Sequence, residues 1–168
     1  MSDVIRYAFG KKSLGDVMVA ASDKGVVALE FVDDREVAEK SFHSRFMDAK
    51  VVSDQTGLSL LLSRIRRVVD QHSDIELDLR GTPYEIKVWN LLREIAAGET
   101  TSYGALAAKL GRRDARDVTV AISTNPIAIL VPCHRVLKKD DSISGYRWGV
   151  RRKRALLERE QLALRGRK

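Results

Sequence analysis

The sequence predicts an α/β (α+β) protein made of two subdomains that meet near Gly81. Up to residue 80, strand-like and helix-like segments follow one another, whereas helical patterns dominate from residue 81 onward. Charge is also unevenly placed: from Gly111 to the end, 15 basic and 6 acidic residues give +9, while the first 110 residues carry −2. We therefore expect an N-terminal α/β scaffold at 1–80 and a mainly helical C-terminal subdomain at 81–168.

The N-terminal part contains a hairpin signal. Apolar runs flank Ser22-Asp-Lys-Gly25, whose composition is typical of a tight turn. Farther along, the apolar stripe that includes Leu61 and Ile65 predicts a helix, and the alternation of Ile75-Glu-Leu-Asp-Leu-Arg80 predicts a half-buried strand. No catalytic constellation is found here, so we interpret this part as scaffold. The expected elements are strands at 16–21, 25–32 and 75–80 and helices at 35–46 and 58–70.

Three helix-start features coincide just after Gly81. Thr82 suits the N-cap, Pro83 suits the first helical position, and Glu85 completes a capping box. Together they predict a helix that runs to about Ile95.

Two short helices separated by a tight turn are predicted next. The first spans 103–110 and ends before Gly111, a residue favoured just past helix ends. Asp114 suits the N-cap of the second helix, at 115–124. Two helices around such a turn are the pattern of a helix-turn-helix, whose second helix commonly reads DNA. The basic residues around the turn are Arg112, Arg113 and Arg116.

Cys133 is the single cysteine, and it follows a continuous apolar run, 127–131, that we expect to be buried. A lone cysteine in a core is ordinarily a small apolar side chain. However, an adjacent His134 and Arg135 are uncommon in a core, and Pro132 restrains the backbone just before the thiol. Two interpretations stay open: an inert buried thiol, or a thiol activated by a nearby base or positive field.

The last predicted helix, 151–164, carries a carboxylate on its apolar face. Glu160 shares this face with Leu156 and Leu164. Because an unpaired carboxylate is costly there, we expect Glu160 either to reach solvent or an arginine at the edge of the stripe, or to hold a histidine as in a catalytic triad. Glu158 is the less favoured alternative for that role.

Composition excludes several classes of protein. One cysteine permits no internal disulfide and no cysteine-rich zinc module, and His43, His72 and His134 are scattered, so we expect no metal. No apolar run reaches the roughly 18 residues of a membrane span, and the N-terminus lacks the features of a signal peptide. We therefore expect an intracellular protein whose basic C-terminal part binds a polyanion.

Several short motifs of the C-terminal part occur in one order and spacing. They are Arg80-Gly-Thr, Val88-Trp89, Gly98-Glu-Thr, Ser102-Tyr103, Leu106-Ala107, Asn125-Pro126, Pro132-Cys-His-Arg-Val136, Gly145-Tyr146 with Gly149, and Leu156-Leu157 with Glu160. Together they resemble the O6-alkylguanine-DNA alkyltransferases, most closely the bacterial methyltransferase domain at the C-terminus of Ada-type proteins. The resemblance is dense from about Arg80 to Glu160 and weaker before it. It implies a ribonuclease-H-like N-terminal subdomain and a winged-helix-like C-terminal one.

The resemblance implies roles for individual residues. Cys133 is the expected alkyl acceptor, with His134 as its base through a water molecule and Glu160 orienting the imidazole. Asn125 is expected to brace the active-site turn, and Tyr103 to donate a proton to the guanine ring.

The resemblance also implies which residues contact DNA. Arg116 is expected to fill the space that a flipped nucleotide leaves, and the helix-turn-helix to bind the minor groove. The other expected DNA contacts are Arg112, Arg113, Thr101, Ser102 and Arg135. The expected lining of the base pocket is Val131, Pro132, Tyr146, Arg147 and Trp148.

The implied function is direct-reversal DNA repair: transfer of the alkyl group of O6-methylguanine, and of O4-methylthymine, in duplex DNA to Cys133, once per molecule and without a cofactor. We expect a monomer, cytoplasmic in a bacterium and nuclear in a eukaryote. Two alternatives stay open. One is a non-enzymatic protein that recognises lesions, but the proteins of this kind that resemble the family lack the reactive cysteine. The other is a cysteine hydrolase, which requires an oxyanion hole, and no motif for one is present.

Two residues of the second short helix depart from the family pattern. Asp117 stands where alanine is usual, and Thr119 replaces a small residue. A negative charge on a helix that faces DNA weakens binding unless it is paired, and Arg113 and Arg116 are the expected partners. We expect these departures to change DNA affinity rather than the type of reaction.

Overall fold

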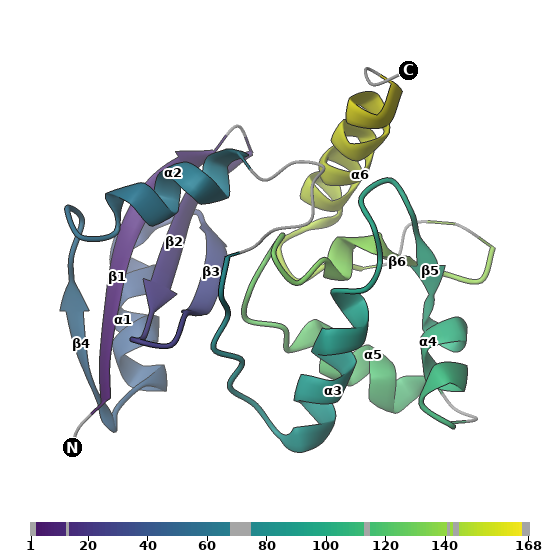
Figure 1. Ribbon diagram of the computed structural model, residues 1–168, viewed down its shortest axis with the longest axis horizontal. Helices are drawn as coiled ribbons and strands as arrows, with labels where there is room; N and C mark the ends of the chain where they lie inside the picture. The colour runs from purple at the N-terminus through teal and green to yellow at the C-terminus, as the bar shows by residue number, and fades with distance from the viewer. Residues whose placement is uncertain are drawn as a thin grey trace. The chain divides into compact units, whose positions relative to one another are not determined.

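The computed structural model describes residues 3–12, 14–67, 75–112, 115–140, 142 and 145–165. These residues divide into two compact units, coloured from purple to teal and from teal to yellow in Figure 1. The first holds the described residues up to Arg67 together with 75–80, and the second holds those from Gly81 onward. Among the described helices, none combines the length and the apolar character that crossing a membrane requires.

The first unit is built on a four-stranded sheet in the order β3-β2-β1-β4. The pairs β1–β2 and β2–β3 are antiparallel, whereas β4 runs parallel to β1. The predicted hairpin is confirmed, since β2 and β3 are joined through a turn in which Ser22 N donates to Gly25 O at 2.9 Å. The strands are β1 (Asp3–Lys12), β2 (Gly15–Ala21), β3 (Val26–Val32) and β4 (Ala49–Ser53).

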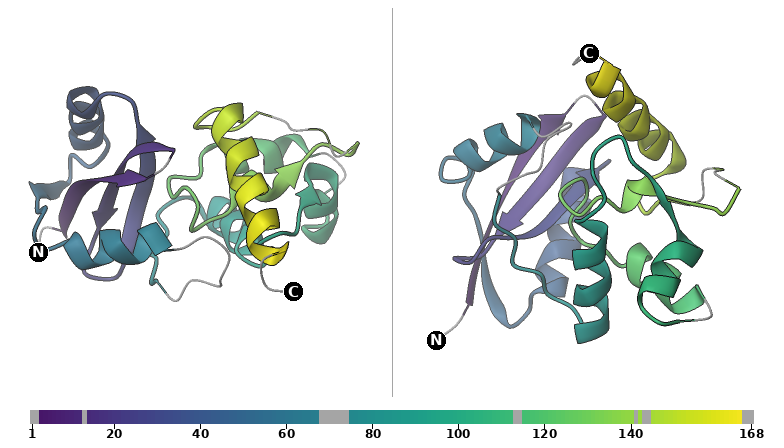
Figure 2. Two further views of the ribbon diagram at one scale, coloured as in Figure 1. Left: turned by 90° about the horizontal axis from the view of Figure 1, so that it is seen from above. Right: turned by 45° about the vertical axis from the view of Figure 1, so that its right-hand side comes forward.

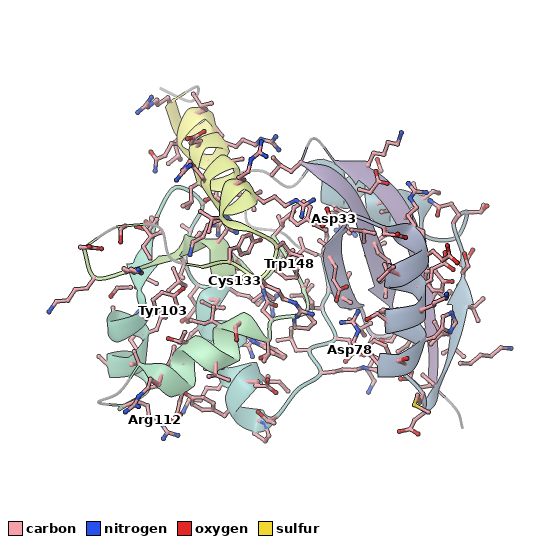
Figure 3. All side chains as sticks on the ribbon, turned by 180° about the vertical axis from the view of Figure 1, so that it is seen from behind. Asp33, Asp78, Tyr103, Arg112, Cys133 and Trp148 are labelled. Atoms are coloured by element: carbon pink, nitrogen blue, oxygen red, sulfur yellow. The ribbon has the colours of Figure 1, made fainter. Side chains whose placement is uncertain are left out.

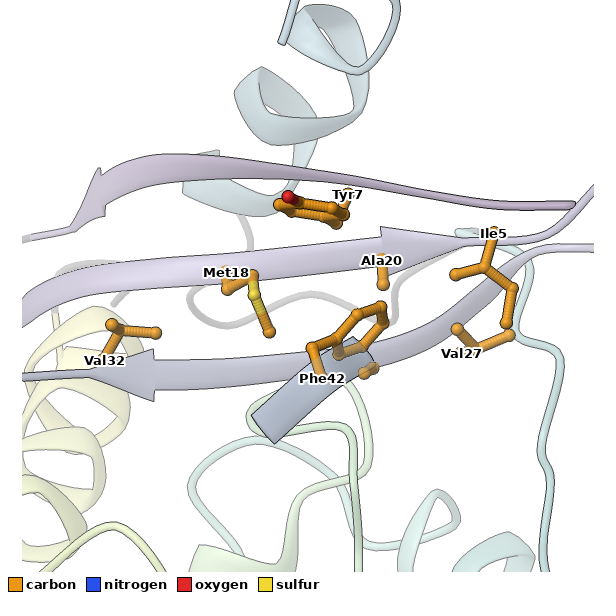
Figure 4. Close-up of a cluster of buried hydrophobic side chains, with 8 residues drawn as sticks. Ile5, Tyr7, Met18, Ala20, Val27, Val32 and Phe42 are labelled. Atoms are coloured by element: carbon orange, nitrogen blue, oxygen red, sulfur yellow. The ribbon is translucent and has the colours of Figure 1, made fainter. Parts of the chain in front are cut away.

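Helices α1 (Arg35–Arg45) and α2 (Ser59–Arg67) cover opposite faces of this sheet (Figure 2). Phe42 of α1 is fully buried against side chains of β1, β2 and β3 (Figure 4). On the other face Leu62 of α2 lies against Gly10 of β1, where an added Cβ would come within 2.8 Å of a leucine methyl. The unit is thus a sheet packed between two helices, in agreement with its interpretation as scaffold.

One predicted strand of this unit is wrong. Residues 75–80 form only an isolated bridge, between Leu77 and Val26, instead of a continuous strand. Polar side chains hold the segment in place: Asp78 accepts from Ser22 Oγ at 2.6 Å and from Arg80 Nη2 at 2.9 Å. The alternating pattern therefore belongs to a segment that side-chain hydrogen bonds hold in place, and not to a strand. The predicted end of the preceding helix, 68–70, and His72 lie outside the described residues.

The second unit is mainly helical, as predicted, so the α+β class is confirmed. A two-stranded parallel pair, β5–β6, joins the segment before the helix α4 to the segment after Cys133. In chain order its elements are α3 (Pro83–Leu92), β5 (Thr101–Ser102), α4 (Tyr103–Lys109), α5 (Arg116–Ser123), the 3₁₀ turn η1 (Cys133–Arg135), β6 (Val136–Leu137) and α6 (Val150–Arg165).

The start of α3 is as the sequence predicts. Thr82 Oγ1 accepts from Glu85 N at 3.1 Å, and Glu85 Oε1 accepts from Thr82 N at 2.9 Å, which is the capping box. Trp89 anchors the helix on α5 by donating from Nε1 to Ala121 O at 2.8 Å. The helix ends at Leu92, three residues before the predicted end.

The apolar run 127–131 is buried, as expected, but it forms turns rather than a strand. Leu130 N donates to Ala128 O at 2.7 Å and Val131 N to Ile127 O at 3.2 Å, so its polar groups are satisfied locally. Ile129 has a φ of 70°, a left-handed conformation that is uncommon for a β-branched residue. The run therefore bends sharply just before Cys133.

Candidate active site

Cys133 begins η1 and is 4% exposed, directly after the bend of residues 127–131. Pro132, just before it, is also buried. In the view of Figure 3, Cys133 lies inside the second unit, between the labelled Tyr103 and Trp148. The thiol is thus covered by its own unit at rest.

Asn125 ties this bend together from its centre. Its amide nitrogen donates to Val131 O at 3.0 Å, to Ile127 O at 3.2 Å and to Cys133 Sγ at 3.2 Å. Its amide oxygen accepts from Ile127 N at 3.0 Å. One fully buried side chain therefore holds both ends of the bend and the sulfur atom, which is the bracing geometry expected for Asn125.

His134 and Glu160 form a buried pair. The imidazole Nε2 lies 2.6 Å from Glu160 Oε1, and both side chains are almost fully inaccessible. Glu160 also accepts from Arg135, at 3.0 Å from Nε and 2.8 Å from Nη2. The carboxylate on the apolar face of α6 is thus satisfied by two neighbours of Cys133, and Glu158, the alternative, is exposed.

Burial raises the pKa of Cys133 to about 11. The hydrogen bond from Asn125 and the positive charges of Lys153 and Arg147 act in the opposite direction but do not outweigh it. The resting thiol is therefore protonated at neutral pH, and a thiolate forms only when a base removes the proton.

Burial lowers the pKa of His134 below its ordinary value of 6.5, although Glu160 partly opposes this effect. Burial alone would raise the pKa of Glu160, but the hydrogen bonds and charges of His134 and Arg135 outweigh it and lower that pKa. The pair is therefore a neutral imidazole beside a carboxylate at neutral pH. A neutral imidazole is the form that accepts a proton.

We expect the protein to lose stability as the pH falls below about 6.5, because the unfolded chain then protonates His134 while the folded chain keeps it neutral. Above that pH the contribution of neutral His134 to the stability is fully present. Below it the free energy of unfolding falls by at most about 1.4 kcal/mol per pH unit. Urea unfolding between pH 7.5 and pH 5 measures it. A His134→Gln variant should show a flatter profile, and an equally steep profile for that variant would assign the loss to other groups.

The segment after Gly145 packs beside the cysteine. Arg147 Nη1 donates to Asn125 O at 2.8 Å, and its guanidinium lies 5.2 Å from the centre of the Trp148 ring. The Tyr146 and Trp148 rings meet edge to face, 5.4 Å apart. Burial, followed by the nearness of Cys133, raises the pKa of Tyr146 well above its ordinary range. The structure thus brings these predicted pocket residues to the bend that carries the thiol.

Tyr103 is placed by the short parallel pair. Thr101 pairs with Val136, the residue just after η1, and Ser102 pairs with Leu137. Ser102 also caps α4 by accepting from Ala105 N at 3.0 Å. Tyr103, the first residue of α4, is therefore attached to the segment that continues from Cys133.

Of the residues expected to act at the helix pair α4–α5, some are exposed and others lie outside the described residues. Arg116 is exposed at the first position of α5, and Arg112 is exposed in the turn before it. Arg113 and Asp114, the predicted cap, lie outside the described residues. The residue at the N-cap position is Ala115, which makes no side-chain capping bond.

Two charged residues have partners that the sequence did not predict. Arg135, an expected DNA contact, points inward: its guanidinium donates to Glu160 and, at 2.6 Å, to Ile95 O, and only 13% of its side chain is exposed. The adjacent Cys-His turn directs it inward, where it neutralises the buried carboxylate. Asp117 pairs with Arg112, at 3.7 Å, and Arg113, one of its two expected partners, lies outside the described residues.

Lys153 is a buried residue that was not predicted from the sequence. It is 1% exposed, and its Nζ donates to Val136 O at 2.6 Å. Burial lowers its pKa to about 8. A signal for it exists in the sequence, because Lys153, Leu156 and Glu160 follow the spacing of one helix face. The surrounding run Arg151–Arg154 obscures this pattern, because four consecutive basic residues predict a solvent-exposed surface.

Comparisons with known proteins agree with this fold. Residues 83–162 match the family described as 6-O-methylguanine DNA methyltransferase, DNA binding domain. The chain is 38% identical to the bifunctional transcriptional activator/DNA repair enzyme Ada of Escherichia coli, over 93% of this chain and 45% of that protein. It is 52% identical to a methylated-DNA–protein-cysteine methyltransferase of Mycobacterium tuberculosis over 52% of this chain and 54% of the relative. The chain thus spans about half the length of these relatives.

Solved structures extend the likeness over nearly the whole chain. The crystal structure of Mycobacterium tuberculosis OGT in complex with DNA aligns with 94% of this chain and 93% of that one, at 33% identity and a TM-score of 0.79. The structure of the Mycobacterium tuberculosis O6-methylguanine methyltransferase aligns over the same shares at 31% identity and a TM-score of 0.77. Fold and site define a two-unit α+β protein with a buried thiol centre in its helical unit. The chain belongs to the O6-methylguanine-DNA methyltransferase family, which confirms the resemblance.

Proposed function

We propose that this protein repairs DNA by moving a methyl group from O6 of guanine to Sγ of Cys133, once per molecule. The observation that carries the proposal is the arrangement at the bend: Asn125 holds the sulfur at 3.2 Å, and the next residue, His134, is paired with Glu160 at 2.6 Å. A buried thiol beside a buried imidazole–carboxylate pair is the constellation of an activated nucleophile.

The assignment of the base follows from the hydrogen bonds of His134. Glu160 engages Nε2 and therefore favours the tautomer with its proton on that nitrogen. Nδ1 is then the basic nitrogen, and it has no hydrogen-bond partner among the described residues. In this proposal Nδ1 takes the thiol proton, directly or through water, and Glu160 stabilises the imidazolium that results.

The transfer itself is a displacement at a saturated carbon. Sγ forms a bond to the methyl carbon while the bond from that carbon to O6 breaks, and the electron pair of the broken bond passes to the guanine. Tyr103 donates a proton to the guanine ring, which makes guanine a better leaving group; such acid catalysis contributes about 10²–10⁴-fold. The thioether formed is stable, so each molecule reacts once.

Duplex DNA is the proposed partner because the reacting base must leave the stack to reach a buried thiol. We propose that α4 and α5 contact the duplex and that Arg116, exposed at the start of α5, fills the gap. The residues from Gly111 onward carry a charge of +9, which favours a polyanion. Tyr146, Arg147, Trp148, Val131 and Pro132 form the proposed lining of the base pocket.

The test is an intact-mass measurement after the protein is mixed with excess duplex DNA containing O6-methylguanine. We expect a gain of one methyl group, confined to Cys133 by peptide mapping and stopping at one equivalent. A Cys133→Ser variant is the matched control and should gain nothing. Lesion-dependent binding without a mass gain would support a non-enzymatic recognition protein instead, and continued product release would support a hydrolase.

A further inference from the structure

The turn between α4 and α5 holds an arginine in a defined position. Arg112 N donates to Ala107 O at 2.9 Å, so the end of α4 sets where its backbone lies. Its guanidinium lies 5.1 Å from the centre of the Tyr84 ring of α3, and its Nη1 lies 3.7 Å from Asp117 Oδ2 of α5. Figure 3 shows Arg112 at the outer end of the helix pair, away from Cys133. Residues of α3 and α5 therefore contact this guanidinium, and α4 positions its backbone.

Asp117 stabilises the start of α5. It is the acidic residue of the first turn of α5, a helix whose N-cap residue, Ala115, supplies no side-chain bond. A carboxylate in the first turn stabilises a helix because it faces the positive end of the helix dipole. The same carboxylate places a negative charge on the helix that carries Arg116, the proposed DNA-inserting residue.

We propose that Asp117 limits the affinity for DNA by occupying the guanidinium of Arg112 in place of a backbone phosphate. This inference rests on the proposed function, because it requires that α4 and α5 face the duplex. The pair is accessible to a phosphate, since 50% of the Arg112 side chain and 68% of the Asp117 side chain are exposed. An exposed pair of this kind is weak, so a phosphate can displace the carboxylate, but the carboxylate remains nearby as a repulsive charge.

The inference predicts a particular pattern in a double-mutant cycle. Asp117→Asn frees Arg112 for a phosphate, and one additional phosphate contact makes the slope of log K against log salt more negative by about 0.9. The affinity for undamaged duplex DNA should rise about fivefold at low salt. Arg112→Gln alone should change the affinity by less than about twofold, because its charge is already neutralised. In the double variant the gain from Asp117→Asn should disappear.

The measurement is a salt titration of binding to undamaged duplex DNA by fluorescence anisotropy, with the full chain. Glu158→Gln is the matched control, since it removes a carboxylate from an exposed position of α6 and should leave the salt slope unchanged. Asp117→Ala is a second variant, which replaces a capping charge with a strong helix former and guards against a folding defect. Thermal unfolding verifies that every variant is folded.

Two outcomes would overturn the inference. If Asp117→Asn leaves the affinity and the salt slope unchanged, Asp117 does not limit DNA binding. If the gain persists in the double variant, Asp117 acts by general repulsion and not through Arg112. Methyl transfer to Cys133 is measured separately with each variant. Transfer without any effect of Asp117 contradicts this inference alone, and an effect of Asp117 on binding without any transfer contradicts only the proposed reaction.

Discussion

Glu160→Ala is expected to destabilise the protein by about 3–5 kcal/mol and to abolish methyl transfer. The carboxylate accepts hydrogen bonds from Arg135 at 2.8 Å and lies 2.6 Å from His134 Nε2, all in a buried environment. Its removal leaves the Arg135 guanidinium buried without its counter-charge, and it leaves His134 without the group that sets its tautomer. Urea unfolding and the intact-mass assay measure the two effects.

Glu158→Ala is the control for this prediction, because Glu158 is an exposed carboxylate on the same helix. We expect it to change the stability by less than about 0.5 kcal/mol. Glu160→Gln should fall between the two, since it keeps the shape and an acceptor oxygen but not the charge. A loss below about 1 kcal/mol for Glu160→Ala would be incompatible with a buried pair between Glu160 and Arg135.

Asn125→Leu is the second change with a large expected effect. It removes the acceptor for Ile127 N and the donor for Ile127 O, Val131 O and Cys133 Sγ, all of them buried. Each buried polar group left without a partner costs about 1–3 kcal/mol, so we expect a loss of at least about 3 kcal/mol in the free energy of unfolding. The bend that presents the thiol should also relax, which lowers the rate of methyl transfer at saturating DNA.

Ser123→Ala, two residues earlier, provides the comparison. Its hydroxyl donates within α5, to Val120 O, and the side chain is exposed. We expect a change below about 0.5 kcal/mol and an unaltered rate of transfer. Asn125→Asp separates shape from hydrogen bonding, because it keeps the size of the side chain but cannot donate to the sulfur. If Asn125→Leu folds normally and transfers at the wild-type rate, the bend does not depend on Asn125.

Both predictions concern a reactive centre that is built from polar groups inside a core. Such groups are costly unless they are paired. Asn125 bonds to the backbone of the bend, and Glu160 pairs with His134 Nε2 and with Arg135, while His134 Nδ1 has no partner among the described residues. If the proposed reaction is correct, the stability of the second unit and the reactivity of Cys133 therefore depend on the same hydrogen bonds.

Elements with a strong local signal were predictable from the sequence. The capping box of Thr82 and Glu85 defines the start of α3, and the turn at Ser22–Gly25 defines the hairpin of β2 and β3, because both depend on residues a few positions apart. β1 and β4 were not predicted; β4 is short, and its apolar residues Ala49, Val51 and Val52 are only partly buried. The run 127–131 was correctly expected to be buried, but periodicity alone does not distinguish a strand from a buried bend.

The order and spacing of the motifs around Cys133 determined the family and the residues of the candidate site. Only the tertiary structure decided what the charged side chains do there. It turned Arg135 inward to Glu160, buried Lys153 within a basic run, and paired Asp117 with Arg112. The reason is physical: the partner of a charge is chosen by which side chains the packing of distant elements brings within hydrogen-bond distance. A carboxylate 25 residues from its arginine leaves no mark in the local pattern of either segment.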